Sequence, residues 1–114
     1  MKIVTEKESK TILVSDSCVA KEYPNGDPDI WGSVIEVRGR YPARGVTVNE
    51  ECKELVYILD GEGILVVNET AYQFHKGDQI VIDKGEKFYW EGNLVMFMPC
   101  TPAWYPAQHK TLEE

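Results

Sequence analysis

The feature that most constrains the fold of this chain is a series of short apolar stretches separated by turn-forming residues. Most stretches are rich in valine, isoleucine, leucine and aromatic residues and alternate apolar with polar positions, a pattern typical of β-strands. They predict strands over residues 11–15, 33–39, 45–49, 54–60, 63–68, 70–74, 79–83, 87–91 and 94–98. Turn formers lie between them, among them Asp60-Gly61, Lys76-Gly77-Asp78, Lys84-Gly85-Glu86 and Gly92-Asn93. Many short strands at this spacing predict an all-β sandwich or barrel.

Length and charge limit the domain organisation and the partners. The 114 residues fit one domain, so we expect a single domain over residues 1–114. A formal net charge of -7 argues against nucleic acid and anionic membranes as partners, because few basic side chains are free to neutralise phosphates. Residues 22–31 predict an ordered loop, and the polar residues 108–114 are expected to fray.

The cysteines and the N-terminus indicate a reducing compartment. Cys18, Cys52 and Cys100 are odd in number and form no CxxC pair. The first ten residues are polar and carry no apolar core of a secretory signal, and no apolar run approaches the ~20 residues of a membrane span. We therefore expect a cytoplasmic protein whose cysteines are small buried hydrophobic residues.

The stretch over residues 54–60 has two apolar faces. Alternation places Glu54, Val56, Ile58 and Asp60 on one side and Leu55, Tyr57 and Leu59 on the other. A barrel interior would cover one side. The N-terminal strand or a partner subunit would cover the second, which favours a homodimer.

Two glycine-framed segments resemble the motifs of the cupin superfamily of small β-barrels. In the first, Glu54 is followed by six residues and Gly61; in the second, "GDQIVIDKGEKFYWEG", Gly77, Gly85 and Gly92 keep the spacing of the family. The resemblance covers about residues 45–100. It implies a cupin-type double-stranded β-helix, a jelly-roll barrel, and it also implies a homodimer.

The metal ligands of that family are largely replaced in this sequence. The first two histidine positions fall on Thr47 and Asn49, or on Val48 and Glu50 in the other spacing, and the third falls on Phe88, which leaves Glu54 alone. Because transition metals prefer several imidazole or thiolate ligands, we expect neither a metal nor another cofactor. A non-standard site from Glu50, Glu51, Cys52, His75 and His109 stays open, although we expect His75 in a surface turn, His109 in the polar tail and Cys52 in the core.

If the family geometry applies, the barrel interior holds the candidate ligand-binding residues Thr47, Asn49, Phe88, Trp90, Glu36 and Trp104, and Arg38, Met96 and Met98 are further candidates. Trp31, Trp90 and Trp104 are candidate stacking faces, and the proline-rich segment 98–110 is expected to cross the mouth of the barrel. The same aromatic side chains can instead belong to the core.

Glu54 is the candidate catalytic residue. A carboxylate among apolar rings is desolvated, which raises its pKa and prepares it for general acid or base catalysis. Pairing with Lys53, Arg38 or Arg44 is the structural alternative. Three functions remain open: binding of a sugar-like or carboxylate ligand without metal, a metal-independent sugar isomerase or epimerase that uses Glu54, and a structural barrel filled by Phe88 and Trp90.

Overall fold

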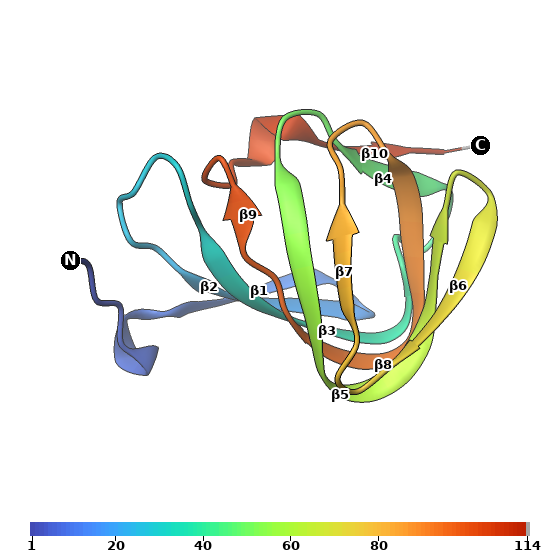
Figure 1. Ribbon diagram of the computed structural model, residues 1–114, viewed down its shortest axis with the longest axis horizontal. Helices are drawn as coiled ribbons and strands as arrows, with labels where there is room; N and C mark the ends of the chain where they lie inside the picture. Colours follow the sequence, from blue (N-terminus) through green and yellow to red (C-terminus); the bar gives the residue numbers. More distant parts are fainter. Residues whose placement is uncertain (114) are drawn as a thin grey trace.

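Antiparallel strands make up most of the chain in the computed structural model, which describes residues 1–113 (Figure 1). The elements are η1 (Glu6–Glu8), β1 (Lys10–Ser15), β2 (Cys18–Tyr23), β3 (Gly32–Tyr41), β4 (Val46–Asn49), β5 (Lys53–Val67), β6 (Thr70–His75), β7 (Gln79–Ile82), β8 (Lys87–Phe97), β9 (Cys100–Thr101), η2 (Pro106–Gln108) and β10 (His109–Leu112). Within residues 1–113, no helix is long and apolar enough to cross a membrane.

The strands form one sheet that curls into a half-barrel (Figure 1). Its main path runs β1-β2-β3-β8-β4-β10, and β5 pairs with β6, β7, β8 and β9. β8 is central, because it pairs with β3, β4 and β5. The prediction of an all-β barrel is confirmed.

Glycines bend the two longest strands where the sequence predicted turns. The expected strands 54–60 and 63–68 are one strand, β5, and the expected strands 87–91 and 94–98 are one strand, β8. Gly92 lies opposite Gly39 on β3 and opposite Gly63 on β5, so three adjacent strands carry glycine where the sheet curves. Their backbones approach closely: a β-carbon on Gly92 would lie 2.6 Å from the α-carbon of Gly63. The turns predicted at Gly61 and Gly92 are therefore wrong, because these glycines allow curvature within a continuous ladder.

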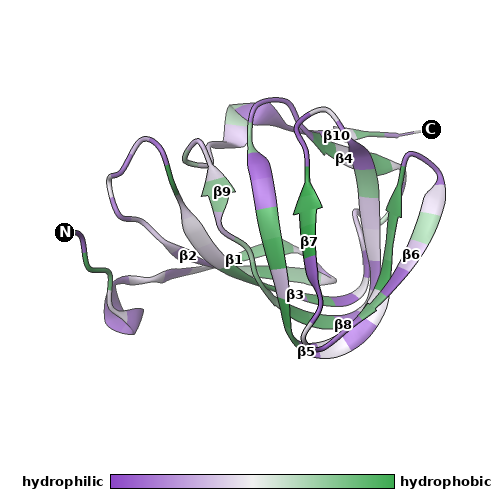
Figure 2. Ribbon diagram, viewed as in Figure 1, coloured by the Kyte–Doolittle hydropathy of each residue, from purple (hydrophilic) through white to green (hydrophobic). Residues whose placement is uncertain are grey.

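The inner face of the curled sheet forms the hydrophobic core. Val56 and Ile58 are fully buried, as their alternation predicted, and they pack with core residues of the other strands such as Leu94 and Met96. β7 is hydrophobic through most of its length in Figure 2, and its Ile82 faces the core. This interior supplies the main apolar burial of the fold.

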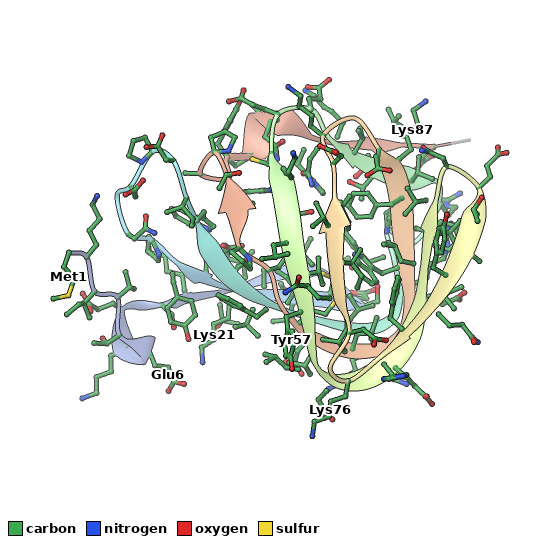
Figure 3. The ribbon with its side chains drawn as sticks, in the orientation of Figure 1. Met1, Glu6, Lys21, Tyr57, Lys76 and Lys87 are labelled. Carbon is green, nitrogen blue, oxygen red and sulfur yellow. The ribbon has the colours of Figure 1, made fainter. Side chains whose placement is uncertain are left out.

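The outer face of β5 is apolar and exposed in the single chain. Leu55, Tyr57 and Leu59 keep 40–42% of their surface accessible, and Tyr57 projects outward from the strand in Figure 3. The N-terminal strand does not cover this face, since β1 pairs with β2 at the far edge of the sheet. A partner subunit on this face stays a prediction.

The N-terminal hairpin contains a strand that the sequence pattern missed. β2 occupies part of the segment expected to be loop and pairs with both β1 and β3. An ion pair of 3.0 Å between Glu6 and Lys21 ties η1 to β2, and both side chains lie together beside the N-terminal segment in Figure 3. β2 thereby extends the concave face of the sheet.

The C-terminal segment is also a strand. β10 pairs with β4 in the register His109 opposite Asn49 through Leu112 opposite Val46, at the end of the molecule where both strands are drawn side by side (Figure 1). The expected fraying is wrong for residues 109–112, because β4 offers a free edge for backbone hydrogen bonds. Glu114 lies outside the described residues.

We expect Gly61→Ala to destabilise the protein more than Gly85→Ala. Both glycines have positive φ, +87° and +81°, so both substitutions carry the same backbone cost, about 1–2 kcal/mol. Only at Gly61 would the new β-carbon meet a backbone atom, the Asn93 carbonyl oxygen at 1.9 Å. Urea unfolding should show an additional loss of about 1–3 kcal/mol for Gly61→Ala. Equal losses would contradict the close approach of β5 and β8.

Candidate functional site

A cavity of about 370 Å³ opens on the concave face of the half-barrel. Strands far apart in the sequence contribute its walls, and the segment before β10 contributes its rim. Its lining includes Tyr41, Glu54, Phe88, Trp90, Trp104 and His109. This volume lies within the ordinary range of small-molecule sites. A cavity beside Glu54 contradicts the alternative in which Phe88 and Trp90 fill the barrel.

Glu54 brings a buried carboxylate to the wall of this cavity. It lies at the start of β5, opposite Ile82 on β7 and Cys100 on β9, and its residue surface is 8% exposed. Burial raises its pKa to about 7, a hydrogen bond from Asn49 opposes the rise, and the charge of Glu22 adds to it. The acid and the carboxylate forms of Glu54 are therefore both populated near neutral pH.

A chain of amides holds the Glu54 carboxylate in place. The backbone N–H groups of Glu51 and Cys52 donate to Oε1 of Gln108, at 3.2 and 3.0 Å. The Gln108 Nε2 therefore faces Asn49 and donates to its Oδ1 at 2.9 Å. Asn49 is thereby oriented with Nδ2 toward Glu54, and this nitrogen donates to Oε1 of the carboxylate at 2.7 Å. Both amide side chains are 1% exposed, so water does not compete for these bonds.

The same chain fixes the tautomer of His109. Asn49 Oδ1 only accepts, so His109 Nδ1, at 2.8 Å, must carry a hydrogen. Burial lowers the pKa of His109, which favours the neutral ring. Its Nε2 is then an acceptor. Tyr41 Oη and Thr47 Oγ1 each lie 2.9 Å from it, and Thr47 donates its hydrogen to the carbonyl of Lys110.

Tyr41 is consequently the donor to His109. Burial raises the pKa of its hydroxyl to about 12, so the phenol keeps its proton at neutral pH. The Tyr41 and His109 rings are nearly parallel, 5° apart, with centroids separated by 6.3 Å. The cavity thus contains a carboxyl group that titrates near neutrality and a tyrosine–histidine pair that can accept a proton at Nε2.

The structure brings most of the predicted site residues together, but Glu36 and the further candidate Arg38 lie outside the cavity. Phe88, Trp90 and Trp104 line the cavity. Thr47 and Asn49 lie behind its wall, where Asn49 accepts from His109 Nδ1 and Thr47 Oγ1 lies 2.9 Å from Nε2. The placement of Glu36 in the interior is wrong. It is exposed on β3 and pairs with Arg38 at 3.1 Å, because Ser33, Ile35 and Val37 take the inward positions of that strand.

The residues of the open non-standard metal site do not gather. His75 is exposed in a turn and bonded to the Lys76 carbonyl, and Cys52 is a buried free thiol beside the Pro102 carbonyl. Within residues 1–113, no group of three or more His, Cys, Asp or Glu side chains can hold a metal ion.

The donor set at the motif positions does not fit a cupin metal centre either. Thr47 and Asn49 have their polar atoms engaged by Lys110, His109 and Glu54, and Phe88 offers no ligand. Near them, His109 has both ring nitrogens within hydrogen-bonding distance of other side chains.

Three residues of the site, Tyr41, Gln108 and Glu22, were not predicted from the sequence, and His109 was named only as a candidate metal ligand. His109 and Gln108 were assigned to a fraying tail, although His109 belongs to a strand and Gln108 is buried. Residues 18–23 do not alternate apolar with polar positions, so periodicity gave no signal for the strand that carries Glu22. No local signal joins residues 49 and 109, whose pairing spans 60 positions of the chain.

Comparisons with known proteins are consistent with this architecture. Residues 42–98, which are 57 of the 114 residues, match the family described as Cupin domain. No curated protein matches the chain in sequence.

Several solved structures share the fold at 17% identity. The Streptomyces protein Pac13, described as a nucleoside dehydratase, gives a TM-score of 0.87 over 97% of this chain and 90% of its own. The polyketide cyclase RemF from Streptomyces resistomycificus gives 0.77 over 100% and 87%. Ectoine synthase from P. lautus gives 0.74 over 98% and 90%.

We predict that Glu54 titrates with a midpoint near pH 7, measured by ¹³C NMR of the labelled carboxyl against a Glu54→Gln spectrum for assignment. Because the folded pKa lies above the ordinary 4.5, the folded protein holds a proton that the unfolded chain releases. The free energy of unfolding should therefore fall between pH 4.5 and 7, relative to Glu54→Gln, by on the order of 3 kcal/mol.

The comparison with Glu54→Gln isolates this residue. His109 has a lowered pKa and acts in the opposite direction, because its stabilising contribution is lost as the pH falls below 6.5. Both proteins retain His109, so its contribution largely cancels. A Glu54 midpoint near 4.5 would contradict the burial of the carboxylate.

We expect Gln108→Ala to lower the free energy of unfolding by about 2–4 kcal/mol, because the N–H groups of Glu51 and Cys52 lose their acceptor. Gln73→Ala, on an exposed position of β6, is the control and should change stability by less than about 0.5 kcal/mol.

In ¹⁵N NMR at neutral pH, the wild-type His109 should be protonated at Nδ1. A neutral ring protonated at Nε2 would contradict the orientation of Asn49.

Proposed function

The chain belongs to the cupin family, and from this premise we propose that its cavity binds a small organic molecule on which Glu54 acts as a general acid or base. The ligand would lie against Phe88 and Trp90, with Trp104 at the rim. The proposed chemistry uses the side chains of this chain, since the residues at the family's ligand positions do not fit a metal.

The observation that carries the proposal is the environment of the Glu54 carboxylate. One of its oxygens accepts a hydrogen bond from Asn49, and the residue lines a cavity of about 370 Å³. A carboxyl group with a pKa of about 7 is suited to give and take protons at neutral pH. A buried carboxylate without an ion pair lowers the free energy of unfolding, and this cost supports a functional role for Glu54.

Tyr41 and His109 supply the second half of the proposed chemistry. The Tyr41 hydroxyl can donate a hydrogen bond to the ligand when it is released from His109. His109 Nε2 can then accept a proton from the ligand, and Asn49 Oδ1 stabilises the resulting ring at Nδ1. An isomerisation, an epimerisation or an elimination requires one group to remove a proton and another to donate one, and Glu54 and the Tyr41–His109 pair would share these roles.

Proteins of similar fold support a ring-sized ligand. Structures of Streptomyces Pac13 with uridine have a TM-score of 0.87 to this chain. RemF is described as a polyketide cyclase. These likenesses concern the fold, so the proposed catalytic roles rest on Glu54, Tyr41 and His109 of this chain.

Ligand binding without chemistry is the second candidate. It is favoured by the tryptophans Trp31, Trp90 and Trp104, which line one cavity and offer stacking faces for a ring. Sugar-like ligands combine apolar ring faces with hydroxyls that Glu54 and Tyr41 can bind.

We expect Glu54→Gln to keep ligand binding and lose proton transfer. A panel of sugars, nucleosides and cyclic ketones would be screened by the rise in melting temperature. Ligands that bind would then be incubated with the protein in D₂O, and deuterium incorporation at carbon would be followed by NMR. The wild type should exchange hydrogen at least ~100-fold faster than Glu54→Gln, as expected for a general acid or base.

Glu36→Gln is the matched control, because it neutralises an exposed carboxylate outside the cavity and should leave the exchange rate unchanged. Binding without exchange in the wild type would support the second candidate. Equal exchange by Glu54→Gln would dismiss the role of Glu54.

A further inference from the structure

The charged side chains that line the cavity and are buried or half-buried are acidic. Glu54 and the half-buried Glu22 both line the wall. Among the lining residues that the structure describes, the one lysine is Lys10, which is exposed on β1, and there is no arginine. His109 has a lowered pKa and is neutral at neutral pH.

The two carboxylates line the same cavity, and no cationic side chain pairs with either of them within residues 1–113. The negative charge of Glu22 raises the pKa of Glu54, and burial raises the pKa of Glu22 itself. Their negative potential is therefore uncompensated inside the cavity, where screening by water is weak.

Aromatic rings surround these carboxylates. Trp31, Trp90, Trp104, Phe88 and Tyr41 contribute to the same cavity wall. The indole N–H of Trp31 donates to Oε2 of Glu22, which fixes the ring beside the carboxylate. The faces of aromatic rings carry negative potential and attract organic cations, most strongly for tryptophan.

We propose that the cavity selects an organic cation, a substituted ammonium group carried on a ring or another apolar body. The inference rests on the proposed ligand site and specifies the charge of its ligand. The ammonium group would lie between Glu22 and Glu54, and the apolar body would pack on the tryptophans. Of the two ligand classes suggested by the sequence, sugar-like and carboxylate, it disfavours the carboxylate, because such a ligand would lie between two acidic side chains without a buried cation to balance its charge.

Three probes of one shape test the charge selection. They are 2-phenylethylammonium, 2-phenylethanol and phenylacetate, each titrated against tryptophan fluorescence at one low ionic strength and neutral pH. We expect the ammonium to bind at least ~10-fold more tightly than phenylacetate, with the alcohol between them.

Variants separate the cavity from the overall charge of the protein. Glu22→Gln removes one carboxylate of the cavity, and Glu36→Gln removes one on the outside of β3. Both change the net charge equally. Glu22→Gln should reduce the preference for the ammonium over the alcohol at least ~3-fold, and Glu36→Gln should leave it unchanged.

The outcomes distinguish this inference from the function on which it rests. Binding of all three probes with equal affinity would overturn the cation selection and leave the ligand site standing. If Glu36→Gln reduced the preference for the ammonium over the alcohol as much as Glu22→Gln, the cation selection would likewise be overturned and the ligand site would stand. If none of the probes binds, both the cation selection and the proposed ligand site are contradicted.

Discussion

One buried hydrogen bond, from the amide of Gln108 to the amide of Asn49, orients the whole polar side of the barrel. Its direction is set by backbone N–H groups that occupy the Gln108 oxygen, and every later bond in the chain follows from it. Asn49 must then donate to Glu54 and accept from His109. A single fixed amide thus determines where the carboxylate lies and which nitrogen of the imidazole is the acceptor.

The buried Glu54 carboxylate destabilises the folded state, and the surrounding structure compensates for this cost. A desolvated carboxylate beside a second one opposes folding, and the fold tolerates it because the apolar core packs behind it and the amides hold it. The curved sheet is the other half of that setting, since Gly63 and Gly92 let β5 and β8 approach closely enough to close the half-barrel. The cavity exists because the sheet bends within its strands.

The sequence predicted the parts of this molecule that depend on local periodicity. Val56 and Ile58 were assigned to the core by alternation, and the spacing of Glu54 to Gly61 indicated the family. Alternation also points Ile35 and Glu36 to opposite faces of β3, so the sequence could have placed Glu36 outside the barrel. His109 was not predictable in this way, because its position depends on the pairing of β10 with β4 across 60 residues. Glycines were ambiguous, since turns and bends within strands require the same backbone freedom.

The replacement of histidines at the family's motif positions did not remove imidazole from the site. In one of the two spacings of the family's motif, the first two histidine positions fall on Thr47 and Asn49. Both residues lie within hydrogen-bonding distance of His109, which enters from the C-terminal strand. A histidine bound in this way has its Nδ1 engaged by an amide and its Nε2 facing a tyrosine hydroxyl. The lone pair on Nε2 accepts the hydrogen bond of Tyr41, whereas a metal ligand needs a lone pair directed at the ion. Where that spacing of the motif has two histidines, this chain has a threonine and an asparagine, and Asn49 orients an imidazole that comes from another strand.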